Sequence, residues 1–117
     1  MRALFFIPPS AYNRRNMPID RVYGCNYGYD YKPAIHFLQV ATFMQARAGW
    51  DVRFLDCPAE GWDAARFEAF VAAERFDVAC AWAVYLSAEE DLRAMRVLRA
   101  AQPTTQAVFM ATAATWK

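Results

Sequence analysis

The chain has 117 residues, 57% hydrophobic and 21% charged, which suffices for one globular domain with a substantial core and excludes a multidomain machine. Thirteen basic and twelve acidic residues give a net charge of +1, which excludes binding to nucleic acid or to an anionic membrane through bulk charge. The three cysteines, Cys25, Cys57 and Cys80, are more than twenty residues apart, so they form neither a disulfide framework nor a CxxC metal site. They predict a reducing, cytoplasmic setting.

The first half of the chain contains two strand patterns and one helix pattern. Residues 3–7 are continuously apolar and are followed by Pro8 and Pro9, which predicts a strand buried on both faces. The apolar run is too short for a signal peptide or a membrane span. A second strand is predicted at 52–56. Between them, residues 33–48 predict a helix that ends at Gly49. Its apolar face comprises Ala34, Phe37, Leu38, Ala41, Met44 and Ala48.

The second half continues the alternation of strand and helix. Residues 62–74 have helical spacing through Phe67, Phe70, Val71 and Ala73, and residues 78–84 form a third apolar run. Ser87 begins a capping box that predicts a third helix, and Pro103 ends this helix. Its apolar positions are Leu92, Met95, Leu98 and Ala101. Residues 107–110 predict a fourth strand.

Strict alternation of strands and helices predicts an α/β fold, a doubly wound, flavodoxin-like (Rossmann-like) parallel sheet with strand order 2-1-3-4. The fourth strand would leave one sheet edge uncovered. We therefore expect residues 1–117 to be one domain, the N-terminal fragment of a longer protein, truncated before the last helix and strand. We expect the isolated chain to be marginally stable or to self-associate through that edge.

A connection of about 25 residues follows the first strand, far longer than the roughly 2 to 6 residues typical of such a loop. It carries five of the six tyrosines, Tyr12, Tyr23, Tyr27, Tyr29 and Tyr31. It leaves the carboxyl end of a central strand, where open α/β sheets bind ligands. Two interpretations remain open: the tyrosines contact a ligand, or they pack over the sheet end or another domain. We expect residues 23–31 to pack back onto the sheet.

The residues after the strands exclude the familiar nucleotide and phosphate chemistries. The chain has four glycines and neither GxGxxG nor GxxxxGK[ST], so dinucleotide and P-loop sites are absent. The turn at 8–11 contains one hydroxyl, which disfavours FMN. A phosphoacceptor receiver domain would need acidic residues after the first strand and an Asp after the third, where this chain has apolar and tyrosine residues.

Single reactive side chains are better explained structurally than catalytically. His36 is the only histidine, so no His pair can bind a metal ion, and its place off the apolar helix stripe predicts a surface or half-buried residue. Cys57 follows an apolar run, which is typical of a packed cysteine. Ser87 is a helix N-cap that also leaves backbone N–H groups beside the sheet edge. No catalytic residue and no metal-ligating residue is predicted in the chain.

The chain resembles the N-terminal cobalamin-binding domain of cobalamin-dependent radical SAM enzymes. The similarity rests on the strand ending in Pro8-Pro9, the helix ending in residues 47–52, the strand ending at Asp56 and the turn that contains Ser87, and it covers nearly the whole chain. The resemblance implies a module that presents a corrinoid to a downstream radical SAM barrel for methyl transfer or a related radical reaction. The partners it implies are cobalamin and that barrel, while the near-neutral charge predicts neither a nucleic-acid nor a membrane partner.

The resemblance also implies how the cofactor binds. Nothing like the Asp-x-His-x-x-Gly motif of methionine synthase-type carriers occurs, which implies cobalamin with its lower base displaced and no protein imidazole. The cofactor-binding positions it implies are Pro9, Ser10, Tyr85, Ser87, Ala111 and Thr112. The family usually has Gly-Gly where this chain has Ala111-Thr112. The CxxxCxxC motif is absent, so an iron-sulfur cluster and S-adenosylmethionine would belong to the downstream domain only.

A second hypothesis is a non-catalytic α/β scaffold or protein-interaction domain, whose tyrosine-rich loop contacts a protein and whose sheet edge holds no ligand. The pair Ala111-Thr112 in place of Gly-Gly favours this alternative.

Overall fold

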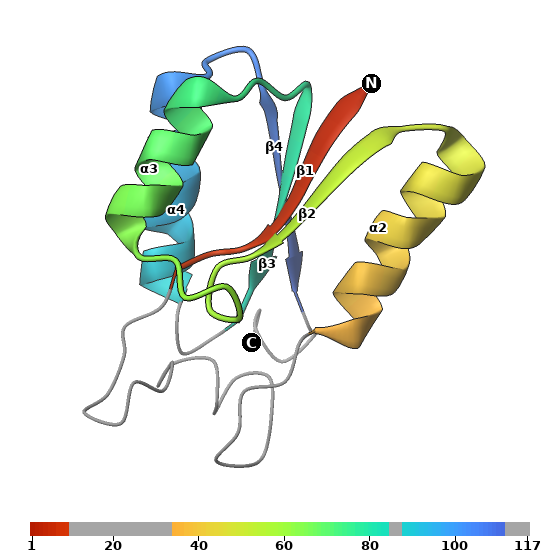
Figure 1. Cartoon of the computed structure of the whole chain (residues 1–117), viewed down its shortest axis with the longest axis horizontal. Coiled ribbons are helices and arrows are strands. Elements are labelled where there is room, and N and C mark those ends of the chain that lie inside the picture. The colour runs from red at the N-terminus through yellow and green to blue at the C-terminus, as the bar shows by residue number, and fades with distance from the viewer. Residues whose placement is uncertain (10–33, 85–87, 112–117) are drawn as a thin grey trace.

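Four parallel strands form the middle layer of the protein, in a computed structural model that describes residues 1–9, 34–84 and 88–111. The sheet has the order β2-β1-β3-β4. Its strands are β1 (Arg2–Ile7), β2 (Asp51–Asp56), β3 (Val78–Ala83) and β4 (Gln106–Ala111). Helix α2 (Ile35–Ala48) covers one face, while α3 (Ala64–Ala73) and α4 (Ala88–Ala101) cover the other (Figure 1). The predicted doubly wound parallel sheet and its strand order are confirmed.

Two separate cores lie on the two faces of this sheet, because successive side chains of a strand point to opposite faces. In β1, Leu4 and Phe6 join the core beneath α3 and α4, whereas Ala3, Phe5 and Ile7 join the core beneath α2. All six residues of β3 are buried. A strand buried on both faces has an apolar run in place of an alternating pattern, and this is why residues 3–7 and 78–84 predicted strands correctly.

The buried face of each helix contains fewer residues than the sequence predicted. In α2 the contact stripe is Phe37, Val40, Ala41 and Met44, whereas Leu38 and Ala48 are exposed. The inclusion of Leu38 and Ala48 in the buried face was therefore wrong. The physical reason is that α2 packs on the sheet alone, so only one stripe of its surface meets other side chains.

Similar corrections apply to α3 and α4. Helix α3 begins at Ala64, because Asp63 is its N-cap and the Asp63 carboxylate accepts a 2.8 Å hydrogen bond from the backbone N–H of Arg66. Trp62 precedes the helix, and Ala73 is exposed. In α4 the predicted core residue Leu92 is 46% exposed. It lines a groove between α4 and β4 that no described element covers.

A buried hydrogen-bond network joins the loops at the amino edge of the sheet. The side-chain oxygen of Gln102 accepts from the N–H of Phe76 at 2.9 Å, and its amide nitrogen donates to the carbonyl of Val71 at 2.8 Å. The Thr105 hydroxyl donates to the carbonyl of Phe76 at 2.7 Å. The network therefore ties the end of α3 and the start of β3 to the end of α4.

Several predictions fall outside the described residues. They concern Pro33 at the start of the first helix, the tyrosine-rich connection and the Ser87 cap. Within the part of the chain that the structure describes, no helix is long and apolar enough to cross a membrane.

Candidate functional site

The carboxyl ends of the four strands lie together at one edge of the sheet (Figure 1). β1 and β3 are neighbours in the sheet, yet the helix that follows β1 lies on one face and the helix that follows β3 lies on the other. The edge between these two strands is therefore the topological switch point, where open α/β sheets bind their ligands. We call this edge, from Pro9 to Ala111, the switch edge.

Two of the six predicted cofactor-binding residues are described, and both are half-buried at the switch edge. Phe6 of β1 is level with Ala81 of β3, and Ala83 of β3 is paired with Ala111 of β4. Extending the β1 register by three residues places Pro9 beside the end of β3. Pro9 and Ala111 therefore flank the end of β3 from its two sides.

The other four predicted positions, Ser10, Tyr85, Ser87 and Thr112, lie outside the described residues.

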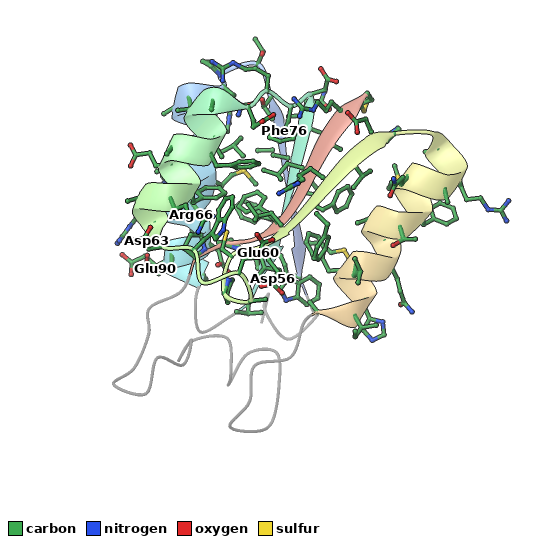
Figure 2. All side chains as sticks on the ribbon, in the orientation of Figure 1. Asp56, Glu60, Asp63, Arg66, Phe76 and Glu90 are labelled. Atoms are coloured by element: carbon green, nitrogen blue, oxygen red, sulfur yellow. The ribbon has the colours of Figure 1, made fainter. Side chains whose placement is uncertain are left out.

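The loop after β2 lies beside the end of β1 and is held by hydrogen bonds to its own turn and to β1. The Asp56 carboxylate accepts from the N–H of Ala59 at 3.0 Å, and the N–H of Cys57 donates to the carbonyl of Ile7 at 3.1 Å. The Arg66 guanidinium lies over the Trp62 ring, 4.5 Å from its centroid. Figure 2 shows Asp56 at this edge, with Asp63 and Arg66 toward α3. Because Asp56 holds its own turn together, it serves the loop structurally.

A buried carboxylate holds the start of the connection between β3 and α4. Asp91 is fully buried in the first turn of α4, and its side chain accepts a 3.0 Å hydrogen bond from the N–H of Val84. Sequence reasoning missed this residue, because acidic residues are common in first helical turns and give no sign of burial there. Asp91 positions Val84, the residue between Pro9 and Ala111 at the switch edge.

The two cysteines in the described part of the chain are packed in the interior of the fold. Cys57 and Cys80 are both buried. Burial raises the pKa of the Cys80 thiol from its ordinary value of 9.0 to about 11, because the thiolate loses its hydration. Cys80 is therefore a neutral thiol near neutral pH. His36 is exposed on the first turn of α2, with its Nδ1 atom 3.3 Å from the side-chain oxygen of Gln39. It is a surface residue, as its place off the apolar stripe predicted.

The raised pKa of Cys80 predicts a loss of stability at high pH. Between pH 9 and 11 the folded chain holds the thiol proton more tightly than the unfolded chain, so the free energy of unfolding falls as the pH rises. The loss reaches roughly 2 to 3 kcal/mol above pH 11. Urea unfolding at several pH values checks this, with Cys80→Ala as the comparison. The variant should lose less stability over the interval than the parent chain, and equal slopes would contradict the prediction.

No group of three metal-ligating side chains occurs within the described ranges. Among the described residues, the switch edge has half-buried Pro9 and Ala111 with buried Val84 at the end of β3, and none of these three side chains is charged. Such a surface can bind and orient a ligand. Comparison with protein-family models, with curated proteins and with solved structures gives no match to this chain.

Proposed function

We propose that this chain is a cobalamin-binding module, which holds a corrinoid with its lower base displaced and presents it to a radical SAM domain for methyl transfer or a related radical reaction. The observation that carries the proposal is the switch edge between β1 and β3. It combines the ligand position of a doubly wound sheet with a sequence that resembles cobalamin-binding domains over nearly the whole chain, apart from Ala111-Thr112 in place of Gly-Gly.

The chemistry of the switch edge suits a large and mostly uncharged cofactor. Pro9, Val84 and Ala111 contribute no charge, and the nearby carboxylates of Asp56 and Asp91 both accept backbone hydrogen bonds. Small side chains at strand ends let a flat ligand approach the backbone closely. Cobalamin supplies the reactive cobalt. The chain's own residues would bind its nucleotide tail, with Pro9 and Ala111 beside it.

The lower face of the cobalt would receive no protein imidazole under this proposal. The only histidine, His36, is exposed on α2, and the motif that supplies an axial histidine in methionine synthase-type carriers is absent. We therefore assign His36 no role in binding.

Reconstitution with hydroxocobalamin tests the proposal. The chain, incubated without oxygen and then desalted, should retain cobalamin with the visible spectrum of the form whose lower base is displaced. His36→Ala should leave that spectrum unchanged. Ala111→Trp should weaken binding by more than about tenfold, equivalent to about 1.4 kcal/mol, because the indole occupies the space beside the end of β3. Ala111→Gly, which restores the family residue, should bind at least as well as the parent.

Two results would overturn the proposal. The first is a folded chain that retains no cobalamin, and the second is a change in cobalt ligation in His36→Ala. Circular dichroism of each variant separates a loss of binding from a loss of fold.

The alternative is a protein-interaction domain whose switch edge holds no ligand. It is favoured by Ala111 in place of glycine and by three exposed apolar residues on the outer side of α2, namely Ile35, Leu38 and Phe43. Apolar residues that gather on one helix face are typical of a contact surface. Absence of cobalamin binding by the folded parent chain and by Ala111→Gly would favour this function.

A further inference from the structure

Strand β4 leaves one edge of the sheet without a partner in the described residues. The N–H of Gln106 donates to the carbonyl of Asp77, toward β3. Since successive residues of a strand point their backbone groups to opposite sides, the N–H and C=O groups of Ala107, Phe109 and Ala111 point outward. The strand contains neither a charged residue nor a proline, the usual devices that keep an edge strand from pairing.

A groove of about 560 Å³ runs beside this edge, between β4 and α4. Leu92, Met95 and Phe109 give it an apolar floor, and Arg96 and Arg99 lie along it. Leu92 is 46% exposed, and Val108 on the opposite face of β4 is 45% exposed. Apolar surface is therefore uncovered on both faces of the unpaired edge.

The charges on the outer side of α4 are arranged so that they would complement those of a second, antiparallel copy of the same helix. Glu89 lies in the first turn, whereas Arg96 and Arg99 lie in the second half of the helix. The four positions Glu89, Leu92, Arg96 and Arg99 share one side of the helix, because they are separated by three or four residues. None of these three charged groups takes part in an ion pair among the described residues.

We propose that two copies of this chain associate through β4 and α4 about a two-fold axis, to form one continuous eight-stranded sheet. The axis passes near Phe109 in the sheet and near Ala94 in the helix. In an antiparallel pair of α4 helices centred on Ala94, Glu89 of one copy is opposite Arg99 of the other. Leu92 is likewise opposite Arg96, whose aliphatic stem can cover it.

The strand and helix contacts are geometrically compatible. Helix α4 lies against β3, and Phe109 of β4 packs against the core that α4 covers. In the dimer the two α4 helices would lie on the same side of the joined sheet and run antiparallel, with their long charged side chains facing each other across the axis. Phe109 and Met95 line the same groove, so both contacts can share one axis.

The backbone groups at the free edge also match. With the axis at Phe109, the outward groups of Phe109 meet those of Phe109 in the second copy. Those of Ala107 meet those of Ala111 in the second copy. Every outward N–H and C=O group from Ala107 to Ala111 would gain a partner, which is the main advantage of edge pairing.

Sedimentation velocity over a range of protein concentrations, combined with charge reversal, tests the pairing of α4. The parent chain should show a reversible monomer–dimer equilibrium. Glu89→Arg and Arg99→Glu should each weaken dimerisation roughly tenfold, because each places like charges at two symmetric positions. The double variant should restore it to within about threefold of the parent. A monomeric parent chain, or single variants that dimerise as well as the parent, would overturn the proposal.

Two further variants test the pairing of β4. Ala107→Pro removes an N–H that points away from β3, so the chain should still fold but should dimerise at least about tenfold more weakly. Phe43→Ser is the control, since Phe43 is exposed on α2, far from the axis. A loss of dimer in Phe43→Ser with none in Ala107→Pro would assign association to α2 and refute the β4 interface. Thermal melts confirm that each variant is folded.

Discussion

Phe37→Ala is expected to remove about 3 to 5 kcal/mol from the free energy of unfolding, the largest loss for any single change considered in this chain. Phe37 has no solvent exposure and is the centre of an aromatic cluster. Its ring lies 5.5 Å from Phe5, 5.7 Å from Phe54 and 5.6 Å from Trp82, measured between centroids. The substitution would leave a cavity between α2 and three strands, and α2 has only one narrow stripe with which to compensate.

Urea unfolding followed by circular dichroism measures the loss. Phe43→Ala is the matched control, because it removes the same side chain from the same helix at a position that is 60% exposed. The control should change stability by no more than about 0.5 kcal/mol. If Phe37→Ala cost less than about 1 kcal/mol, α2 would not be anchored through this ring.

Gln102→Met is expected to cost about 2 to 4 kcal/mol although it preserves the volume of the side chain. The thioether cannot replace the amide, so the N–H of Phe76 and the carbonyl of Val71 would lose their buried partners. An unsatisfied buried backbone group costs about 1 to 3 kcal/mol, which is more than the net value of the bond itself. The loops at the amino edge would therefore separate first.

Chemical denaturation measures the total loss in the free energy of unfolding, and amide hydrogen exchange shows which part of the chain is destabilised. Exchange should accelerate most at Phe76 and at neighbouring amides, and least in β1. Gln39→Met is the control, since Gln39 is exposed on α2. Equal stability of Gln102→Met and the parent would show that packing, and not hydrogen bonding, holds these loops together.

The two central strands were predictable because their burial appears as apolar runs in the sequence, and the strand order followed from the strict alternation of strands and helices. Residues 3–7 and 78–84 are apolar without interruption, which is the signature of strands covered on both faces. Helix faces were less predictable. Leu38 and Leu92 are apolar and correctly spaced, yet both are exposed, because the breadth of a buried stripe depends on which neighbours a helix has in three dimensions. The importance of Gln102 was also hidden, since its partners Val71 and Phe76 are distant in the sequence.

The place of the candidate site was predictable from topology alone, whereas its chemistry was only partly so. Pro9 and Ala111 were predicted to lie together because residues at the carboxyl ends of parallel strands share one edge of the sheet, and their part in cofactor binding stays a prediction. Asp91 was missed because only the fold brings it to the N–H of Val84. Asp56 was noticed, and the structure shows that it caps its own turn.

The manner in which the N-terminus is held suggests how this protein should be attached to a surface. Arg2 donates to Glu74 at 2.7 Å and to the backbone carbonyl of Arg75 at 3.1 Å, and its own N–H donates to Asp77 at 2.7 Å. Met1, one residue earlier, is exposed at the opposite end of the sheet from the switch edge. A biotin or fusion partner placed before Met1 would therefore orient every molecule with its strand ends toward the solution. Immobilised this way, the protein would offer the switch edge to any dissolved ligand, and Arg2 would bear the tension of the tether.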